Sequence, residues 1–291
     1  MKSGIRRTFA FANATLLLLL VFACPRARAA EKPRLLYATV DTQPSSTLVA
    51  ANLKAKQSTV SGTDKDEFRV GVIGSTHFPS SLALAICPAE GEDREGGVAY
   101  TIVNTFDPTK GQLAKLNLRT GAATLVGSPL GHELDIMGMT CSPDGILYAI
   151  GQANSGKPDF NSLFAVDRAT GFATLIGSTN VNEQASPFFS GFLMALAFAP
   201  DGTLYGVSDG ATGSTLFSLD RSTGAATKVI EMNVGSVMGL AINEHGNFYV
   251  ADYVQGSRVY TLQLHTGRVT PILKTHLDFV HNIALQPHDR R

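Results

Sequence analysis

The chain has 291 residues, with 24 basic and 24 acidic side chains, three cysteines and no tryptophan. This balance provides no excess of positive charge for binding nucleic acid or an anionic membrane. The length would suit two ordinary domains, but β repeats also build single domains of this size.

The first 30 residues predict a secretory signal. Lys2, Arg6 and Arg7 form a basic start, residues 16–22 form an apolar run, and residues 27–29 form an Ala-Arg-Ala cleavage site. The Arg6-Arg7 pair also resembles a twin-arginine signal, whereas the run of leucines favours the general secretory route. We therefore expect a periplasmic or secreted protein.

The mature chain is expected to be one domain, residues 31–291. It keeps 19 basic and 24 acidic residues and has no apolar run of the roughly 20 residues that span a bilayer. The sequence thus predicts no transmembrane segment and no nucleic-acid partner. Lipid anchoring at Cys24 is disfavoured because Phe22 makes a poor lipoprotein cleavage box.

A segment centred on a tyrosine recurs five times along the mature chain. The tyrosines are Tyr37, Tyr100, Tyr148, Tyr205 and Tyr249. Apolar stretches in which large and small residues alternate occupy 82–86, 137–141, 194–198, 238–242 and 281–285. This alternation predicts β-strands with one face restricted to small side chains, as the innermost strand of a propeller blade requires.

Two glycine turns complete each repeat. One follows the apolar strand, as in Pro143-Asp144-Gly145, and the other joins a third and a fourth strand at Thr-Gly pairs such as 170–171. Four antiparallel strands at a period of about 50 residues are typical of a propeller blade. The sequence predicts an all-β, five-bladed β-propeller.

The two ends of the chain predict how the ring closes. The mature chain starts at a second strand, 34–40, and finishes at a first strand, 280–286, so these two strands must pair in one sheet. Pairing them also removes exposed strand edges. Residues 54–67 replace the Thr-Gly turn of the first blade, and they are either a surface insertion or part of a sixth blade.

The segments 113–129, 163–179 and 216–230 resemble the repeats of bacterial secreted propellers of the YVTN, NHL and WD40-like groups. The resemblance covers the mature chain and implies the propeller fold. It implies no single activity, because this superfamily includes lactonases, lyases, adhesins and binding scaffolds. Propellers that use PQQ carry a repeated tryptophan, which is absent here, so we expect no cofactor.

The long connections, both between blades and between second and third strands, should emerge on one face of the propeller. Binding sites are usually built on such loops. The candidate ligand-binding residues on this loop-rich face are His77, His132, Asp135, Phe189, Asp278, His281 and Asn282. We expect no metal site, because the histidines and carboxylates share no ligand spacing from blade to blade.

Two of these positions have specific alternatives. His281 and Asn282 replace an apolar and a very small residue, so they are either a ligand-facing pair or a hydrogen-bonded pair at the ring closure. Phe189 belongs to an aromatic cluster that could stack on a sugar or peptide, or fold down over the core as a lid. Cys87 and Cys141 are offset by one residue in the repeat, so we expect two buried thiols rather than a disulfide.

No catalytic motif is present, so the sequence favours a scaffold that binds a small molecule, a glycan or a protein through the loop-rich face. The alternative is a hydrolase or lyase, lactonase- or glycosidase-like, that uses Asp135, Asp278, His281 and His132. A structural or surface-display protein is a third possibility.

Overall fold

The computed structural model describes residues 35–42, 44–53, 70–88, 97–104, 110–130, 134–153, 161–181, 192–210 and 213–286. All of these residues belong to one compact unit, Pro33–Arg291. None of the described segments forms a helix long and apolar enough to cross a membrane.

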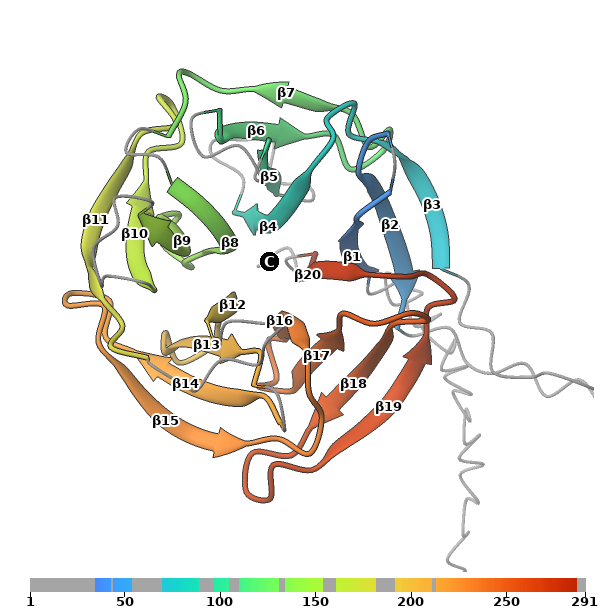
Figure 1. Ribbon diagram of the computed structural model, residues 1–291, viewed down its shortest axis with the longest axis vertical. Helices are drawn as coiled ribbons and strands as arrows, with labels where there is room; N and C mark the ends of the chain where they lie inside the picture. The colour runs from blue at the N-terminus through green and yellow to red at the C-terminus, as the bar shows by residue number, and fades with distance from the viewer. Residues whose placement is uncertain are drawn as a thin grey trace, which may run out of the picture. The chain divides into compact units, whose positions relative to one another are not determined.

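The described strands form five four-stranded antiparallel sheets around a central axis, so the predicted five-bladed β-propeller is confirmed (Figure 1). From the axis outward, blade 1 contains β20 (Val280–Leu285), β1 (Leu35–Val40), β2 (Thr47–Asn52) and β3 (Val70–Ser75). Blade 2 contains β4 (Ser81–Cys87), β5 (Val98–Val103), β6 (Gln112–Leu116) and β7 (Ala123–Leu125).

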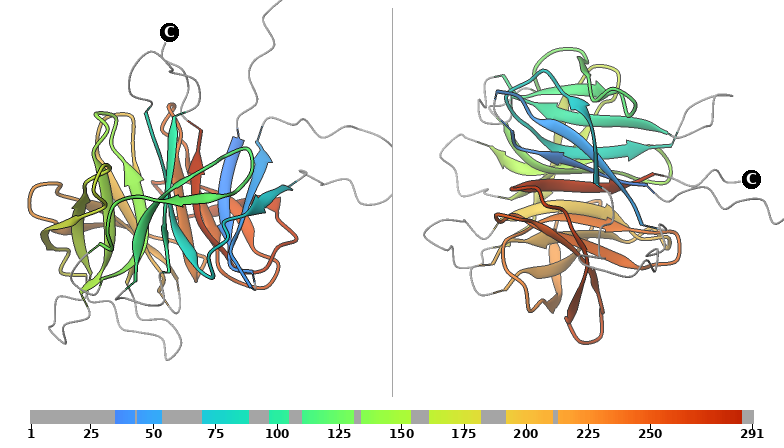
Figure 2. Two further views of the ribbon diagram at one scale, coloured as in Figure 1. Left: turned by 90° about the horizontal axis from the view of Figure 1, so that it is seen from above. Right: turned by 90° about the vertical axis from the view of Figure 1, so that its right-hand side faces the viewer.

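The remaining blades keep the same order from the axis outward. Blade 3 contains β8 (Leu134–Cys141), β9 (Leu147–Ala153), β10 (Ser162–Val166) and β11 (Ala173–Ser178). Blade 4 contains β12 (Leu193–Phe198), β13 (Leu204–Ser208), β14 (Thr215–Leu219) and β15 (Ala226–Glu231). Blade 5 contains β16 (Val237–Ile242), β17 (Phe248–Asp252), β18 (Arg258–Leu262) and β19 (Val269–Lys274). The side views in Figure 2 show how the sheets twist between the axis and the rim.

The ring closes as predicted, because β20 pairs antiparallel with β1. In this pairing Leu36 lies opposite Leu285 and Tyr37 opposite Ala284. Blade 1 is therefore assembled from both ends of the propeller sequence. Its three outer strands, β1, β2 and β3, come from the N-terminal part of the chain, and its innermost strand, β20, comes from the C-terminal part.

The repeated tyrosines stabilise the contacts between blades. Tyr148 is 6% exposed, and its ring lies 5.5 Å from that of Phe198 in the next blade. Tyr205 likewise makes an edge contact with Phe248, with ring centroids 5.1 Å apart. Aromatic pairs of this kind add stability beyond the area they bury. This explains why the same residue recurs in successive blades.

The repeated glycines allow neighbouring blades to approach at the rim. Gly127 has a φ of 60°, and a Cβ there would lie 1.8 Å from the carbonyl oxygen of Thr170 in the next blade. Beside this contact the Ala173 N–H donates a 3.2 Å hydrogen bond to the carbonyl of Leu130. A side chain at Gly127 would separate these strands, so the glycine is required for packing between blades.

Each innermost strand carries a β-bulge near its beginning. In β8, Ile136 pairs with Gly151 and Gly138 pairs with Ile150, which leaves Met137 as an extra residue. The registers of β4, β12, β16 and β20 shift at the equivalent place. Bulges redirect the backbone groups of the strand that contains them. Here they form a ring around the axis.

The prediction of two free thiols is wrong, because Cys87 and Cys141 form a disulfide with a Cα–Cα distance of 5.0 Å. A one-residue offset in the repeat does direct the two side chains to opposite sides of their own strands. The cysteines belong to β4 and β8, however, which lie in adjacent blades. A side chain on the side of β4 that faces blade 3 can therefore meet a side chain on the side of β8 that faces blade 2. The disulfide therefore joins blades 2 and 3.

Candidate functional site

The axis is lined by the free edges of the innermost strands. Each of β4, β8, β12, β16 and β20 lies at the end of its sheet and has a strand partner on one side only (Figure 1). Backbone groups on the other edge face the axis and need another hydrogen-bonding partner.

Asn282 provides such a partner near the beginning of these strands. Its Nδ2 donates to the carbonyl oxygens of Leu82, Met137 and Met194 at 3.2, 2.8 and 3.4 Å. These carbonyls belong to blades 2, 3 and 4, whereas Asn282 belongs to blade 1. One side chain thus links four blades on the axis, which explains why an asparagine stands where the repeat favours a very small residue.

His281 is buried beside this axial amide. It is 5% exposed, its Nε2 has no hydrogen-bond partner, and its ring lies 4.5 Å from that of Tyr253. Desolvation by burial lowers the pKa of His281 from 6.5 to about 3. The imidazole is therefore neutral at physiological pH.

Asp41 lies near the same aromatic ring. Its Oδ1 is buried without a hydrogen-bond partner, and burial raises the pKa of its carboxyl group. Burial, and after it the charge of Asp41, raise the pKa of Tyr253. Near Tyr253, Asp41 and His281 thus each contain a buried polar atom without a hydrogen-bond partner.

We expect replacement of His281 by Met, the residue at this place in blades 3, 4 and 5, to flatten the dependence of stability on acid pH. The folded-state pKa lies below the unfolded value, so the unfolded chain binds the extra proton between pH 6.5 and about 3, and stability falls as pH decreases through that window. Between about pH 7.5 and pH 4.5 the histidine should account for about 2 to 3 kcal/mol of the lost unfolding free energy. Urea unfolding of both proteins at the two pH values measures this difference. Equal losses in the two proteins would contradict the buried neutral imidazole.

The other predicted site residues do not join this group through any described contact. Asp135 in β8 has a buried Oδ1 without a partner, and burial raises its pKa. His77 is exposed, and the Oδ1 of Asp278 accepts a 2.7 Å hydrogen bond from the N–H of Gly256, as in a loop cap. His132 and Phe189 lie outside the described residues. Across the described ranges, no three His, Cys, Asp or Glu side chains are placed to hold a metal ion.

A cavity of about 630 Å³ lies on the axis at the opposite end, where the innermost strands finish. All five blades contribute to its wall, through residues 84–86, 139–143, 196–200, 240–244 and 283–286. The exposed residues Pro88, Pro143 and Pro200 stand among the lining residues, so the cavity reaches solvent at the short-turn end. No pattern in the sequence predicted this cavity.

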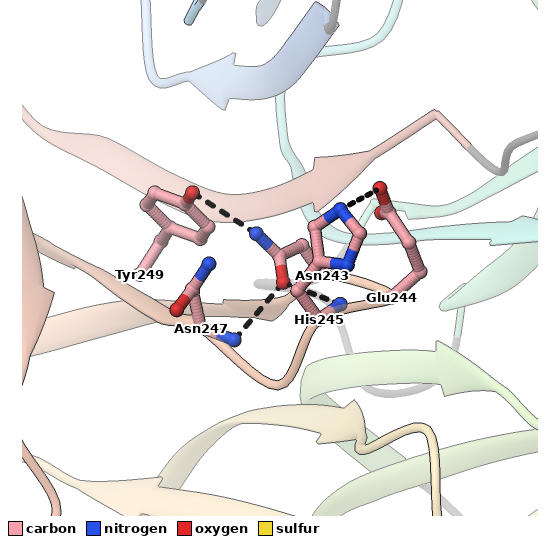
Figure 3. Close-up of polar contacts among 5 residues, drawn as sticks. All are labelled: Asn243, Glu244, His245, Asn247 and Tyr249. Carbon is pink, nitrogen blue, oxygen red and sulfur yellow. Dashed lines mark hydrogen bonds and ion pairs between the residues drawn. The ribbon is translucent and has the colours of Figure 1, made fainter.

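Polar side chains at the cavity mouth already serve the turns that follow the innermost strands. Asn243 Oδ1 accepts hydrogen bonds from the N–H groups of His245 and Asn247, at 2.8 and 2.9 Å, and its Nδ2 donates to the hydroxyl of Tyr249 (Figure 3). Glu244 Oε1 lies 3.2 Å from His245 Nε2. Asn243 is occupied in this way, and the Ser142 hydroxyl likewise bonds within its own turn. The described walls therefore offer backbone polar groups together with the side chains of Thr140 and Gln286.

Comparisons with known proteins show the fold alone. No family model and no curated protein matches the sequence. A chain in the crystal structure of a nidogen/laminin complex is similar, at 11% identity with a TM-score of 0.53, over 87% of this chain and 98% of that one. TolB from Acinetobacter baumannii is similar at 15% identity with a TM-score of 0.50, over 88% and 67%. A putative gluconolactonase is similar at 15% identity with a TM-score of 0.48, over 87% of this chain and 82% of that one.

Proposed function

We propose that the protein is an exported, non-catalytic binding scaffold of the bacterial secreted propeller type that its repeats resemble, and that it holds a small molecule in the axial cavity. The observation that carries the proposal is the cavity of about 630 Å³ with a wall built by all five blades. Ligand sites are commonly concave spaces of about 300 to 1,000 Å³ with mostly apolar walls and a few polar groups.

The cavity favours binding over hydrolysis because it has little acid–base chemistry. Among the described residues that line it, Glu244 is the only ionisable side chain, since Cys141 is in a disulfide. Glycosidases commonly use two carboxyl groups, one on each side of the reacting bond. The hydrolase or lyase alternative would use Asp278 and His281 as acid–base groups. Asp278, however, accepts a hydrogen bond within its loop, and His281 is buried.

Export is supported by two independent features. The first 30 residues have the basic start, apolar run and cleavage site of a secretory signal. The Cys87–Cys141 disulfide suits an oxidising compartment such as the periplasm or the extracellular space.

The loop-rich face is the second candidate surface. Asp41, Asp135 and His281 each contain a buried polar atom without a hydrogen-bond partner, and all three lie at this end of the propeller. A ligand that reaches these atoms would satisfy them. A binding experiment must therefore separate the two ends of the axis.

The test is a ligand-observed NMR screen of neutral, anionic and cationic small molecules against the wild type and Thr140→Phe. Thr140 lines the cavity, so a phenyl ring there should remove binding of the hits. Thr174→Phe is the matched control, because Thr174 is exposed on the outermost strand of the same blade. Hits lost in His281→Met and kept in Thr140→Phe would assign binding to the loop-rich face instead.

A further inference from the structure

The walls of the axial cavity include the edges of the innermost strands that have no strand partner, with their backbone N–H and C=O groups. A strand directs alternate backbone groups to its two edges, and each innermost strand is paired on one edge only. Among the described strands, no two innermost strands pair with each other in a sheet. The cavity therefore presents N–H donors and C=O acceptors from all five blades, and these groups need a partner that enters from solvent.

The cavity offers almost no charge. Its described lining contains no Lys, Arg, His or Asp, and the Glu244 carboxylate at its mouth already lies 3.2 Å from His245. An ionic ligand would lose its hydration without gaining a counter-charge. A purely apolar ligand would leave the backbone donors and acceptors unpaired.

A hydroxyl group matches these walls because it both donates and accepts a hydrogen bond. The C–H faces of a sugar ring can in turn pack on half-buried aliphatic side chains of the lining, such as Ile242 and Leu285. Asn282 precedes the lining residue Ile283 in β20 and has an Oδ1 that is buried and accepts no hydrogen bond. It adds an acceptor to the axis.

We infer that the axial cavity takes a neutral, hydroxyl-rich ligand of monosaccharide or disaccharide size. This inference rests on the proposed function, because it assigns a ligand class to the same cavity.

The test compares probes of similar size and different charge by isothermal titration calorimetry and ligand-observed NMR. The neutral probes are a panel of aldohexoses, pentoses and common disaccharides. The charged probes are gluconate and glucosamine, and cyclohexanol represents a mainly apolar ring. We expect at least one neutral sugar to bind roughly tenfold or more tightly than gluconate, glucosamine and cyclohexanol, because buried groups left unpaired reduce affinity.

Thr140→Phe should abolish sugar binding, and Thr174→Phe should leave it unchanged. If Thr140→Phe does not fold, Gln286→Trp replaces it, since Gln286 is a half-buried lining residue at the mouth. Charged or apolar probes that bind as tightly as the best sugar, or more tightly, and are lost in the cavity variant would overturn the ligand class but keep the proposed function. If no probe or library compound loses binding in the cavity variant, the axial site itself is wrong and both proposals fall.

Discussion

A protein that ends at Phe279, and so lacks β20, will not fold cooperatively. Blade 1 would lose its innermost strand, exposing the edge of β1 and the core that contains Leu36. Val280 and Ile283 are 1% and 2% exposed, so their burial would also be lost. The amide of Asn282, which links four blades, would be removed as well. Circular dichroism should show reduced strand content and no sharp thermal transition, and most of the protein should be insoluble.

A protein that ends at Gln286 is the matched control, because it keeps β20 complete. It should melt close to the full-length protein. If the protein ending at Phe279 also gives a cooperative melt within a few degrees of the full-length protein, closure by β20 and β1 is not what holds the ring together.

The blades and their closure could be predicted because every blade meets the same physical requirements. A tyrosine between sheets, small residues near the axis and glycines at the turns recur at a fixed period, and periodicity is visible without coordinates. The closure could be predicted from the same repeat, because its first recognisable strand, 34–40, is a second strand and its last, 280–286, is a first strand.

The axial cavity could not be predicted in this way. Its walls come from five segments that are distant in the sequence, and its volume depends on how closely the five strand edges approach one another. Its main polar groups are backbone atoms, which every residue type carries. Asn243 looks like an ordinary turn residue in the sequence, and its side chain does serve the turn. Nothing in it indicates the cavity beside it.

The residues at positions 281 and 282 are recognisable in the sequence only as an irregularity of the repeat. The irregularity allows two interpretations, a ligand-facing pair or a hydrogen-bonded pair at the ring closure. Asn282 follows the second, because its amide is bound to three carbonyls. His281 fits neither interpretation fully. Its side chain is buried and not open to a ligand, and its Nε2 has no hydrogen-bond partner. Its place at a ligand site stays a prediction.

Replacing both Cys87 and Cys141 by Ala should destabilise the propeller by roughly 4 kcal/mol, the chain-entropy value for a cross-link between residues 54 positions apart. The bond joins the ends of β4 and β8. In the unfolded chain it keeps residues 87 and 141 together, and this lowers the entropy of the unfolded state. Urea unfolding of the oxidised wild type and the double variant measures the difference. Alanine is chosen because Cys87 is fully buried, and a serine hydroxyl there would add a desolvation cost.

Reducing conditions provide the internal control for this cross-link. With dithiothreitol the wild type should approach the double variant in stability, because both then have an unconstrained unfolded chain. The oxidised wild type should show neither Cys87 nor Cys141 in a thiol titration under denaturing conditions. If both sulfurs titrate, or if oxidised wild type and double variant unfold at the same urea concentration, blades 2 and 3 are held by their packed side chains alone. Titration of both sulfurs would in addition remove the support that the disulfide gives to an oxidising compartment.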